Sequence, residues 1–463
     1  MPAYKPIAAL LAVACAVLAQ PAGADDDAAA LRAELDSLKS DYDARVAALE
    51  ARIAALESAP ESAAVAVVPP VEAVPAAPAA VSASAFNPAI SLVLAGSYAD
   101  TSRDPGDWRL AGFVPNGGEI GPGERSFSLG ESELTLAASV DPYFTGQLTV
   151  AITGEDEIEV EEAFFRTLAL PAGLIAKGGR FFSGFGYLNE VHAHAWDFAD
   201  QPLVYQAFFG NQRAQDGVQL KWLAPTDLFF ELGAETGNGD AFPGTRERGN
   251  GLNGTTLFAH VGGDFGATAS WRAGASWIDL EADGREYEDA DAGGQPVINA
   301  FTGDSRTWAA DAVFKWSPGG NSARRYLKIQ GEYMERRETG DLMFDLENAA
   351  LADSYRSTQS GWYLQGVYQF TPRWRAGLRY DALDSGDPQI GLVSSGTLPA
   401  EAFPALLAGD PSRTTVMVDW NPSEFSRWRL QYAWDEARDD GDTDRQLSLQ
   451  YLFGIGAHGA HKY

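Results

Sequence analysis

The chain has 463 residues, 64 acidic against 34 basic side chains, a formal net charge of −30 and a single cysteine. A mean hydropathy of −0.18 and the absence of a long apolar run in mid-chain exclude a polytopic helical membrane protein. The acidic excess argues against nucleic-acid binding, because such proteins neutralise phosphates with Lys and Arg. A globular chain of this length normally divides into about three domains, but the residue pattern indicates another organisation.

Residues 1–24 are predicted to be a secretory signal peptide. Lys5 supplies the positive charge, Ile7 to Leu18 form the apolar stretch, and small residues precede a cleavage point before Asp25. Cys15 lies inside the apolar stretch behind a poor lipobox, so lipidation is the less favoured alternative. Cleavage would leave a mature chain of 463 − 24 = 439 residues without cysteine, so stability has to come from something other than disulfides.

Residues 28–59 are predicted to form a coiled-coil helix. Apolar residues recur at intervals of three and four, with one four-residue stutter, at Leu31, Leu35, Leu38, Tyr42, Val46, Leu49, Ile53 and Leu56. Residues 60–86 form a linker rich in Pro and Ala, which would be extended and semi-rigid. The linker offers the helix no core to pack against, so self-association is favoured over a solitary amphipathic helix.

From residue 87 to residue 463 the pattern has period two and predicts sixteen strands. Their expected ranges are 89–99, 126–140, 143–153, 157–168, 174–183, 214–223, 227–236, 254–263, 267–280, 305–316, 323–335, 359–370, 373–383, 413–420, 425–435 and 444–455. Tight turns with Pro, Gly and Asp alternate with loops of about 26, 3, 30, 17, 24, 23, 29 and 8 residues. Short turns at one end and longer loops at the other are typical of an outer-membrane β-barrel.

The two faces of the strands support a barrel in lipid. In 426–435, Trp and other bulky residues alternate with Arg, Gln and Asp. Ten of the twelve Trp fall in the apolar phase, mostly near strand ends, at 222, 271, 277, 308, 316, 362, 374, 420, 428 and 434, as aromatic girdles would. We therefore predict an all-β fold: a 16-stranded antiparallel transmembrane β-barrel, preceded by the N-terminal coiled-coil helix and the Pro/Ala linker.

Sixteen strands enclose a water-filled lumen, so residues in the polar phase are candidates for its lining. An acidic stripe and an opposing basic wall are expected from the pore-lining candidates Glu157, Glu159, Glu161, Lys177, Arg180, Lys221, Arg375, Arg379, Arg427 and Arg429. Opposed charges would create a field across the lumen. The alternative is that they solvate the lumen and pair across strands.

The third long loop, residues 184–213, is too aromatic for an ordinary solvated loop. Folding inward would bury its rings and narrow the lumen. Its candidate constriction residues are Phe185, Tyr187, Glu190, His192, His194, Trp196, Asp197 and Asp200.

The hairpin that leads into this loop resembles the phosphate-selective porin O/P family. The resemblance rests on Glu162-Ala163-Phe164-Phe165, a Pro-Ala-Gly turn, Lys177-Gly178-Gly179-Arg180-Phe181-Phe182 and Phe185-Gly186. It implies a trimeric outer-membrane porin with the third loop folded into the pore. Phosphate selectivity does not carry over, because this loop has Glu190, Asp197 and Asp200 with only Arg213 at its end.

A metal-site hypothesis arises from His192-Ala193-His194 with Asp197 and Asp200. Two His one residue apart can reach one metal ion if the backbone is extended, and carboxylates could complete the shell. The plainer interpretation is that the His pair fixes the loop to the barrel wall by hydrogen bonds. We therefore assign no metal ligand and expect no cofactor. His192 and His194 are the candidate ligands if a metal ion does bind.

The function expected from the sequence is passive diffusion of small hydrophilic solutes or ions through an outer-membrane porin. The alternatives are a substrate-specific channel, for example for a divalent metal, and a structural barrel whose coiled-coil arm binds a periplasmic partner or peptidoglycan. No organised nucleophile and base are found, so no enzyme is expected. The expected surroundings are outer-membrane lipid and lipopolysaccharide, with the arm in the periplasm, and the expected assembly is a homo-oligomer, with a trimer favoured.

Overall fold

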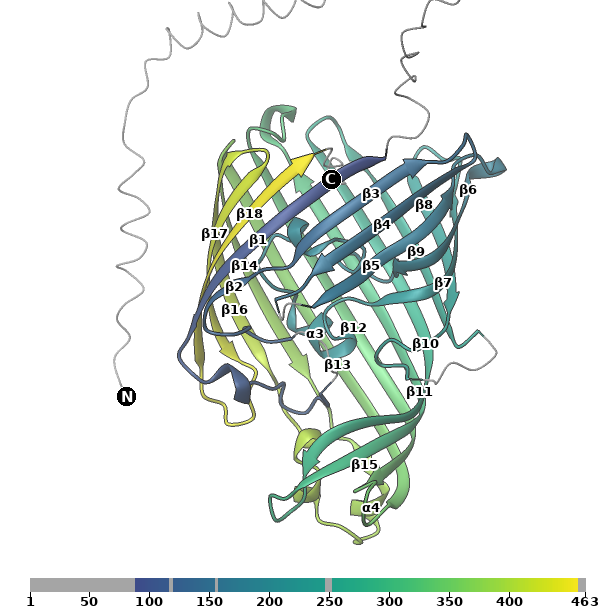
Figure 1. Cartoon of the computed structure of the whole chain (residues 1–463), viewed down its shortest axis with the longest axis vertical. Coiled ribbons are helices and arrows are strands. Elements are labelled where there is room, and N and C mark those ends of the chain that lie inside the picture. Colours follow the sequence, from purple (N-terminus) through teal and green to yellow (C-terminus); the bar gives the residue numbers. More distant parts are fainter. Residues whose placement is uncertain (1–87, 116–119, 155–156, 246–251, 457–463) are drawn as a thin grey trace, which may run out of the picture. The chain divides into compact units, whose positions relative to one another are not determined.

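A computed structural model describes residues 88–115, 120–154, 157–245 and 252–456. The expected signal peptide, coiled-coil helix and linker lie outside the described residues, and so does the C-terminal aromatic residue Tyr463. Figure 1 shows the described part as a barrel of tilted strands.

The wall is one closed antiparallel sheet. Its strands are β1 (Ala89–Thr101), β2 (Ser126–Leu129), β3 (Ser132–Ser139), β4 (Phe144–Ile152), β5 (Ile158–Thr167), β6 (Leu174–Phe182), β7 (Ala214–Leu223), β8 (Phe229–Gly237), β9 (Gly254–Phe265), β10 (Ala269–Ala290), β11 (Pro296–Trp316), β12 (Tyr326–Phe344), β13 (Leu351–Thr371), β14 (Trp374–Asp384), β16 (Ser412–Ser423), β17 (Ser426–Glu436) and β18 (Asp444–Gly456). β1 pairs with β18 on one side and with β2 and β3 on the other, which closes the sheet. β2 and β3 are two parts of one wall strand, so the expected sixteen-stranded barrel is confirmed.

Several short elements lie outside the wall strands. β15 (Gln389–Ile390) pairs with the first part of β13, at Tyr355 and Arg356. The α-helices are α3 (Leu203–Phe209) and α4 (Gly391–Ser394). Short 3-10 turns occur at Pro105–Asp107, Pro171–Gly173, Ala193–Ala195, Pro318–Gly320, Ala400–Ala402 and Pro404–Leu406. Among the described residues, no helix is both long enough and apolar enough to cross a membrane.

The outer face of the wall carries two rows of aromatic side chains. Near the end with the short turns, Trp374, Trp420, Trp428 and Tyr451 are successive cross-strand partners. Nearer the end with the long loops, Trp308 contacts Tyr333 and Trp362 contacts Tyr380. Eight of the ten wall Trp side chains are 37–42% exposed, at 277, 308, 316, 362, 374, 420, 428 and 434. These Trp side chains therefore face outward, as the alternation of the strands predicts.

The prediction of long loops at 281–304 and 336–358 is wrong. β10 and β11 continue to a connection at 291–295, and β12 and β13 continue to one at 345–350. The physical reason is an exchange of the two faces along the strand. Up to Trp277 the bulky side chains of β10 face outward, whereas beyond it Ile278 and Leu280 are buried inside and Asp279 pairs outside with Arg306 at 2.9 Å.

The inward apolar face of these extensions packs against loop seven (residues 385–411). The core residues of this contact are Val114, Ala282, Tyr287, Phe301, Leu342, Phe344, Tyr355, Ile390, Leu392, Ala402, Phe403 and Leu406. Figure 1 shows α4 and β15 at this end of the barrel. The extensions and loop seven therefore form a core like that of a water-soluble protein, with apolar side chains inside and polar side chains outside. The wall to which they are joined has the opposite pattern.

Two neighbouring leucines of loop seven test this core. Leu406 is 4% exposed and Leu407 is 44% exposed. We predict that Leu406→Ala weakens the attachment of loop seven by about 2–5 kcal/mol, because it leaves a cavity. Leu407→Ala should change it by less than about 0.5 kcal/mol. Hydrogen exchange of the loop-seven amides measures both, and equal effects would contradict the buried packing.

Candidate functional site

Loop three (residues 183–213) lies inside the barrel, where Figure 1 shows α3 among the wall strands. At its start, Ser183 Oγ and the Gly184 amide donate to Glu235 of β8 at 2.6 and 2.8 Å. The Tyr187 and Leu188 amides then donate to Glu332 of β12 at 2.9 and 3.1 Å. The loop entrance is therefore held by carboxylates of the wall.

The Glu332 carboxylate accepts hydrogen bonds from several groups at the loop entrance. The hydroxyls of Tyr205 and Tyr363 also donate to it, at 3.0 and 2.7 Å. Gly186 has φ +70°, and a Cβ there would collide with the Glu332 carboxylate and the Tyr205 hydroxyl. The loop therefore requires glycine at this position.

The middle of the loop carries two aspartates that meet a basic wall. Asp197 accepts from Lys328 of β12 at 2.9 Å and from Arg375 of β14 at 2.8 Å. Asp200 pairs with Arg379 of β14 at 3.1 Å and Arg413 of β16 at 2.8 Å. These are bonds between loop and wall that join residues more than 120 positions apart in the sequence.

The cations decide the ionisation of both aspartates. Burial alone would raise the pKa of Asp197, but Lys328 and Arg375 outweigh it and hold the pKa well below its usual range. Burial is likewise outweighed at Asp200, whose pKa is lowered by Arg379 and Arg413. Both side chains are therefore charged at neutral pH.

The basic wall needs these aspartates. The inward faces of β14, β16 and β17 carry five arginines, at 375, 379, 413, 427 and 429, and three aspartates, at 381, 419 and 435, a surplus of two cations (5 − 3). Buried charges are costly unless they are paired. Asp197 and Asp200 supply two carboxylates, and Arg427 and Arg429 also donate to the Trp196 carbonyl.

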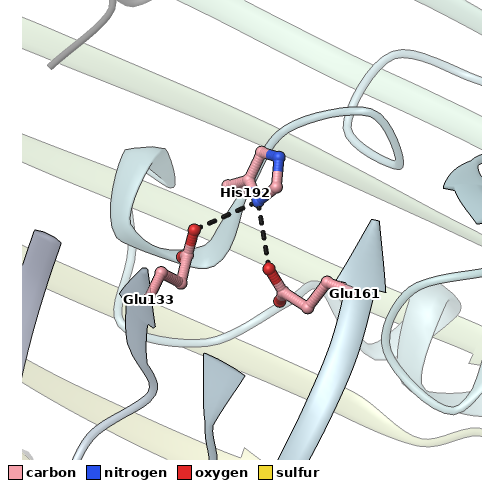
Figure 2. A group of neighbouring side chains, drawn as sticks. All are labelled: Glu133, Glu161 and His192. Atoms are coloured by element: carbon pink, nitrogen blue, oxygen red, sulfur yellow. Dashed lines mark hydrogen bonds and ion pairs between the residues drawn. The ribbon is translucent and has the colours of Figure 1, made fainter. Parts of the chain in front are cut away.

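The first part of the loop meets an acidic wall. His192 lies between Glu133 of β3 and Glu161 of β5 (Figure 2), with its Nδ1 at 3.2 Å from an oxygen of each. Its Nε2 lies 3.1 Å from Glu162, and His194 Nδ1 lies 2.6 Å from Glu133. Burial would lower the pKa of His192, but hydrogen bonds with Glu133, Glu161 and Glu162 outweigh it and raise the pKa well above its usual value.

A break in the strand pattern brings the glutamates together. The register of β5 against β4 shifts between Thr149 and Val150, which leaves Glu161 without a cross-strand partner. Glu162 is therefore buried beside Glu161, where strict alternation would place the two on opposite faces. The bulge thus creates the paired carboxylates that His192 contacts.

An apolar core fills the space between the loop and the wall. Every residue of α3 is buried, and Phe113, in the connection between β1 and β2, packs against Phe208. Wall residues of β10 to β14 complete this core, namely Ile278, Leu280, Ala309, Met334, Tyr363 and Leu383. Loop three is therefore a packed part of the structure.

A polar cavity of about 250 Å³ remains on the opposite side of the loop. Its wall side is formed by β1, β2, β17 and β18, with the hydroxyl and amide side chains Ser97, Thr101, Ser128, Gln431, Gln446, Ser448 and Gln450. Its loop side includes His194, Trp196, Asp200, Gln201, Gln206 and Asn211, and its acidic lining also includes Glu124 and Glu131. Among the described lining residues, none is Lys or Arg.

The sequence candidates fall into separate groups. His194, Trp196 and Asp200 line the cavity. Phe185 is buried in the loop core, Tyr187 lies between Arg272 and Lys328, and Glu190 pairs with Lys221 at 3.0 Å. Lys177 lies over the Phe164 ring, whereas Glu157 and Glu159 are exposed.

Two expectations for candidate side chains need correction. Arg180 is not on the lumenal face: it pairs with Asp216 at 2.7 Å, in the phase of the exposed Val218 and Leu220. Arg180 is three positions from the lumenal Lys177, so the alternation of the strand places it on the opposite face, and the register of β6 against β7 has no shift here. The grouping of His192 and His194 with Asp197 and Asp200 is also wrong, since the aspartates pair with the basic wall.

The residues that sequence reasoning missed come from distant strands. Glu133, Glu332 and the β18 residues Gln446, Ser448 and Gln450 meet loop three or line the cavity only through the closure of the barrel. The acidic pair Glu131 and Glu133, one residue apart on one strand, was the signal available for part of this set.

Removal of one loop carboxylate tests the charge pairing. We predict that Asp197→Asn lowers the free energy of opening of loop three by about 3 kcal/mol, because it leaves Arg375 and Lys328 with an uncompensated buried charge. Hydrogen exchange at the Tyr187, Leu188 and Leu203 amides measures this. As a control, Asp304→Asn removes an exposed partner of Arg306 and should change it by less than about 1 kcal/mol.

The pairing of Asp197 with Lys328 and Arg375 predicts that the opening free energy of loop three depends on pH. The folded-state pKa of Asp197 is lowered from an ordinary value of 3.8, so its stabilisation is fully present above that value and is lost as the pH falls through the folded-state pKa. The difference in opening free energy between the wild type and Asp197→Asn should stay constant from about pH 7 to 5 and shrink below the ordinary carboxyl range. Hydrogen exchange corrected for the intrinsic rate measures it, and a difference that shrinks already at pH 6 would contradict the pairing.

Comparison with known proteins gives likenesses to solved barrels and one relative. The likenesses, at 12% identity and about 80% of this chain, are to a loop-deletion mutant of OmpT of Vibrio cholerae (99% of that chain, TM-score 0.49), OprB of Pseudomonas putida (94%, 0.47) and the channel DcaP of Acinetobacter baumannii (97%, 0.48). All three TM-scores are below 0.5.

No protein-family model matches the chain, so membership of the phosphate-selective porin O/P family stays a prediction. An uncharacterized protein of Aquifex aeolicus (strain VF5) is 31% identical over 409 residues, which cover 82% of this chain and 81% of the relative. At this identity and coverage, the chain belongs to the same family as that Aquifex protein.

Proposed function

We propose that the protein is an outer-membrane channel through which small hydrophilic solutes diffuse passively, with loop three narrowing the lumen. The observation that carries the proposal is the polar cavity between loop three and the strands β17, β18, β1 and β2. Hydroxyl and amide side chains replace part of the hydration shell of a passing solute without binding it tightly.

The outer surface supports a place in a membrane. Trp271 and Trp277 are six positions apart and Trp308 and Trp316 eight, which corresponds to about 20–27 Å along a strand. That distance is comparable to the apolar band of outer-membrane barrels, about 25 Å tall and flanked by aromatic girdles. The short turns would then lie in the periplasm and the strand extensions outside the cell.

The lining charges favour cations and neutral solutes over anions. The arginines of β14, β16 and β17 are paired with aspartates, and therefore do not present free positive charge to the cavity. Glu124 adds a carboxylate to its lining, and none of the described lining residues is Lys or Arg. A lumen of this kind attracts cations at low ionic strength.

A homo-oligomer, with a trimer favoured, remains part of the proposal. The outward-facing pair Arg180–Asp216 supports it, because charged groups on a lipid-facing surface are unfavourable near the bilayer centre and a neighbouring subunit would cover them. The N-terminal arm in the periplasm, contact with lipopolysaccharide and a non-enzymatic role are proposed with it.

Two neighbouring residues of β18 test the route. Ser448 lines the cavity, whereas Leu449 is exposed on the outer face. In planar bilayers the wild type should form stable channels, Ser448→Trp should reduce single-channel conductance several-fold by filling the cavity, and Leu449→Trp should leave it unchanged. Under a salt gradient the wild-type reversal potential should have the sign of a cation-preferring pore.

Absence of stable wild-type channels would overturn the proposed function. Conductance of Ser448→Trp equal to that of the wild type would show that solutes pass elsewhere. A reversal potential of the opposite sign would overturn the cation preference alone.

A further inference from the structure

His192 has more carboxylate oxygens around it than it has protons to donate. Figure 2 shows its ring pointing between Glu133 and Glu161. Its Nδ1 lies 3.2 Å from Glu133 Oε2 and 3.2 Å from Glu161 Oε2. One ring nitrogen carries at most one hydrogen, so a proton on Nδ1 can satisfy only one of the two oxygens.

The remaining oxygen is buried. Glu133 is 2% exposed, and its Oε2 has no hydrogen-bond donor among the described residues once Nδ1 donates to Glu161. A buried carboxylate oxygen without a donor is costly. The shortage is one of positive charge, since Glu133, Glu161 and Glu162 meet here and, in the described part of the chain, His192 and His194 are the basic side chains paired with them.

We propose that a divalent transition-metal ion of the zinc type binds between His192 Nδ1 and the carboxylates of Glu133 and Glu161. The three ligand atoms lie within 4.8 Å of one another. Metal–ligand bonds of about 2.0–2.2 Å in a tetrahedron place ligand atoms about 3.3–3.6 Å apart, close to the 3.2 Å that separates Nδ1 from each carboxylate oxygen. The mixed nitrogen and carboxylate donor set suits zinc.

The surrounding groups hold these ligands in the required form. With the metal on Nδ1, the imidazole is neutral and its Nε2–H donates to Glu162, 3.1 Å away. Glu162 also accepts from Gln147 at 3.0 Å, and His194 contacts the other oxygen of Glu133 at 2.6 Å. A metal-bound His whose second nitrogen donates to a carboxylate is the usual arrangement in protein metal sites.

The ion has a route to the site and a structural effect there. His194 and Glu131 line the polar cavity, so an ion in the cavity reaches the cluster, and a water molecule from the cavity supplies the fourth ligand. The bound ion joins loop three to β3 and β5, where the loop otherwise has only hydrogen bonds to the acidic wall. The inference rests on ligand geometry and would stand for a barrel that does not conduct.

The test is metal binding by the full-length mature protein, refolded in metal-free buffer. Titration with Zn²⁺ against a chromophoric chelator should give one tight site per chain, and Co²⁺ should give the visible absorption of a tetrahedral nitrogen and oxygen site. His192→Gln and Glu161→Gln should abolish the tight site. Glu162→Gln should weaken it about 10- to 100-fold, because it removes the acceptor that orients His192.

His260→Ala is the matched control. His260 is buried in the same barrel and contacts a glutamate, with Nδ1 3.1 Å from Glu231, but it lies outside the cluster. The His260→Ala substitution should leave Zn²⁺ affinity unchanged. Heat-modifiable migration in gels should show that each variant folds, since Asp197, Asp200 and Glu332 hold loop three independently.

Three results would overturn the inference: no tight Zn²⁺ site in the wild type, equal affinity in folded His192→Gln, or equal loss in His260→Ala. Loss confined to the cluster variants, with normal conductance in the metal-free wild type, would support it and leave the proposed channel function standing.

Discussion

The complementarity between the charges of loop three and those of two opposed walls is the constraint on which the rest of the lumen depends. The basic wall on β14, β16 and β17 has two more cations than anions, and Asp197 and Asp200 meet it. The acidic wall on β3 and β5 meets His192 and His194. Neither wall could be buried alone, because unpaired charges in a low-dielectric interior are strongly unfavourable. Of the charges expected to face each other across the lumen, Glu161, Arg375 and Arg379 pair with the loop, whereas Glu157 and Glu159 are exposed.

In the proposed channel, this arrangement decides where water and solutes can pass. The apolar side of the loop, centred on α3, packs against β10 to β14. Its first and middle parts, at His192, Asp197 and Asp200, meet the two charged walls. What remains open is the cavity beside β1, β2, β17 and β18, where Ser, Thr and Gln side chains line the wall together with Ala and Leu. In the proposed channel, this cavity, with Glu124 in its lining, would be the passage for small hydrophilic solutes.

The sequence predicted those parts of the fold that depend on local alternation. Strand number, the tight turns and the outward Trp phase follow from period two in residues near one another. Glu162 was not predicted because a bulge breaks that alternation locally. Arg180 was wrongly placed in the lumen although it lies three positions from the lumenal Lys177, where alternation puts it on the outer face. The partners of His192 and Asp197 could not be predicted because the closure of the barrel brings them together. His192 and Glu133, for example, are 59 residues apart (192 − 133). The extensions of β10 to β13 were taken for loops because the apolar phase changes face after Trp277.

That change of face has a consequence for how the barrel accommodates variation. The hydrogen-bonded ladder between β10 and β11 runs on beyond Trp277 and Trp308 with one irregularity near Ala282, so the backbone itself does not mark where lipid would end. Only the side-chain pattern marks it. Matched two-residue insertions in both strands beyond this point would lengthen the projecting hairpin and keep every inward residue inward. The outer projection can therefore change in height in discrete steps while the aromatic rows keep the same distance from each other.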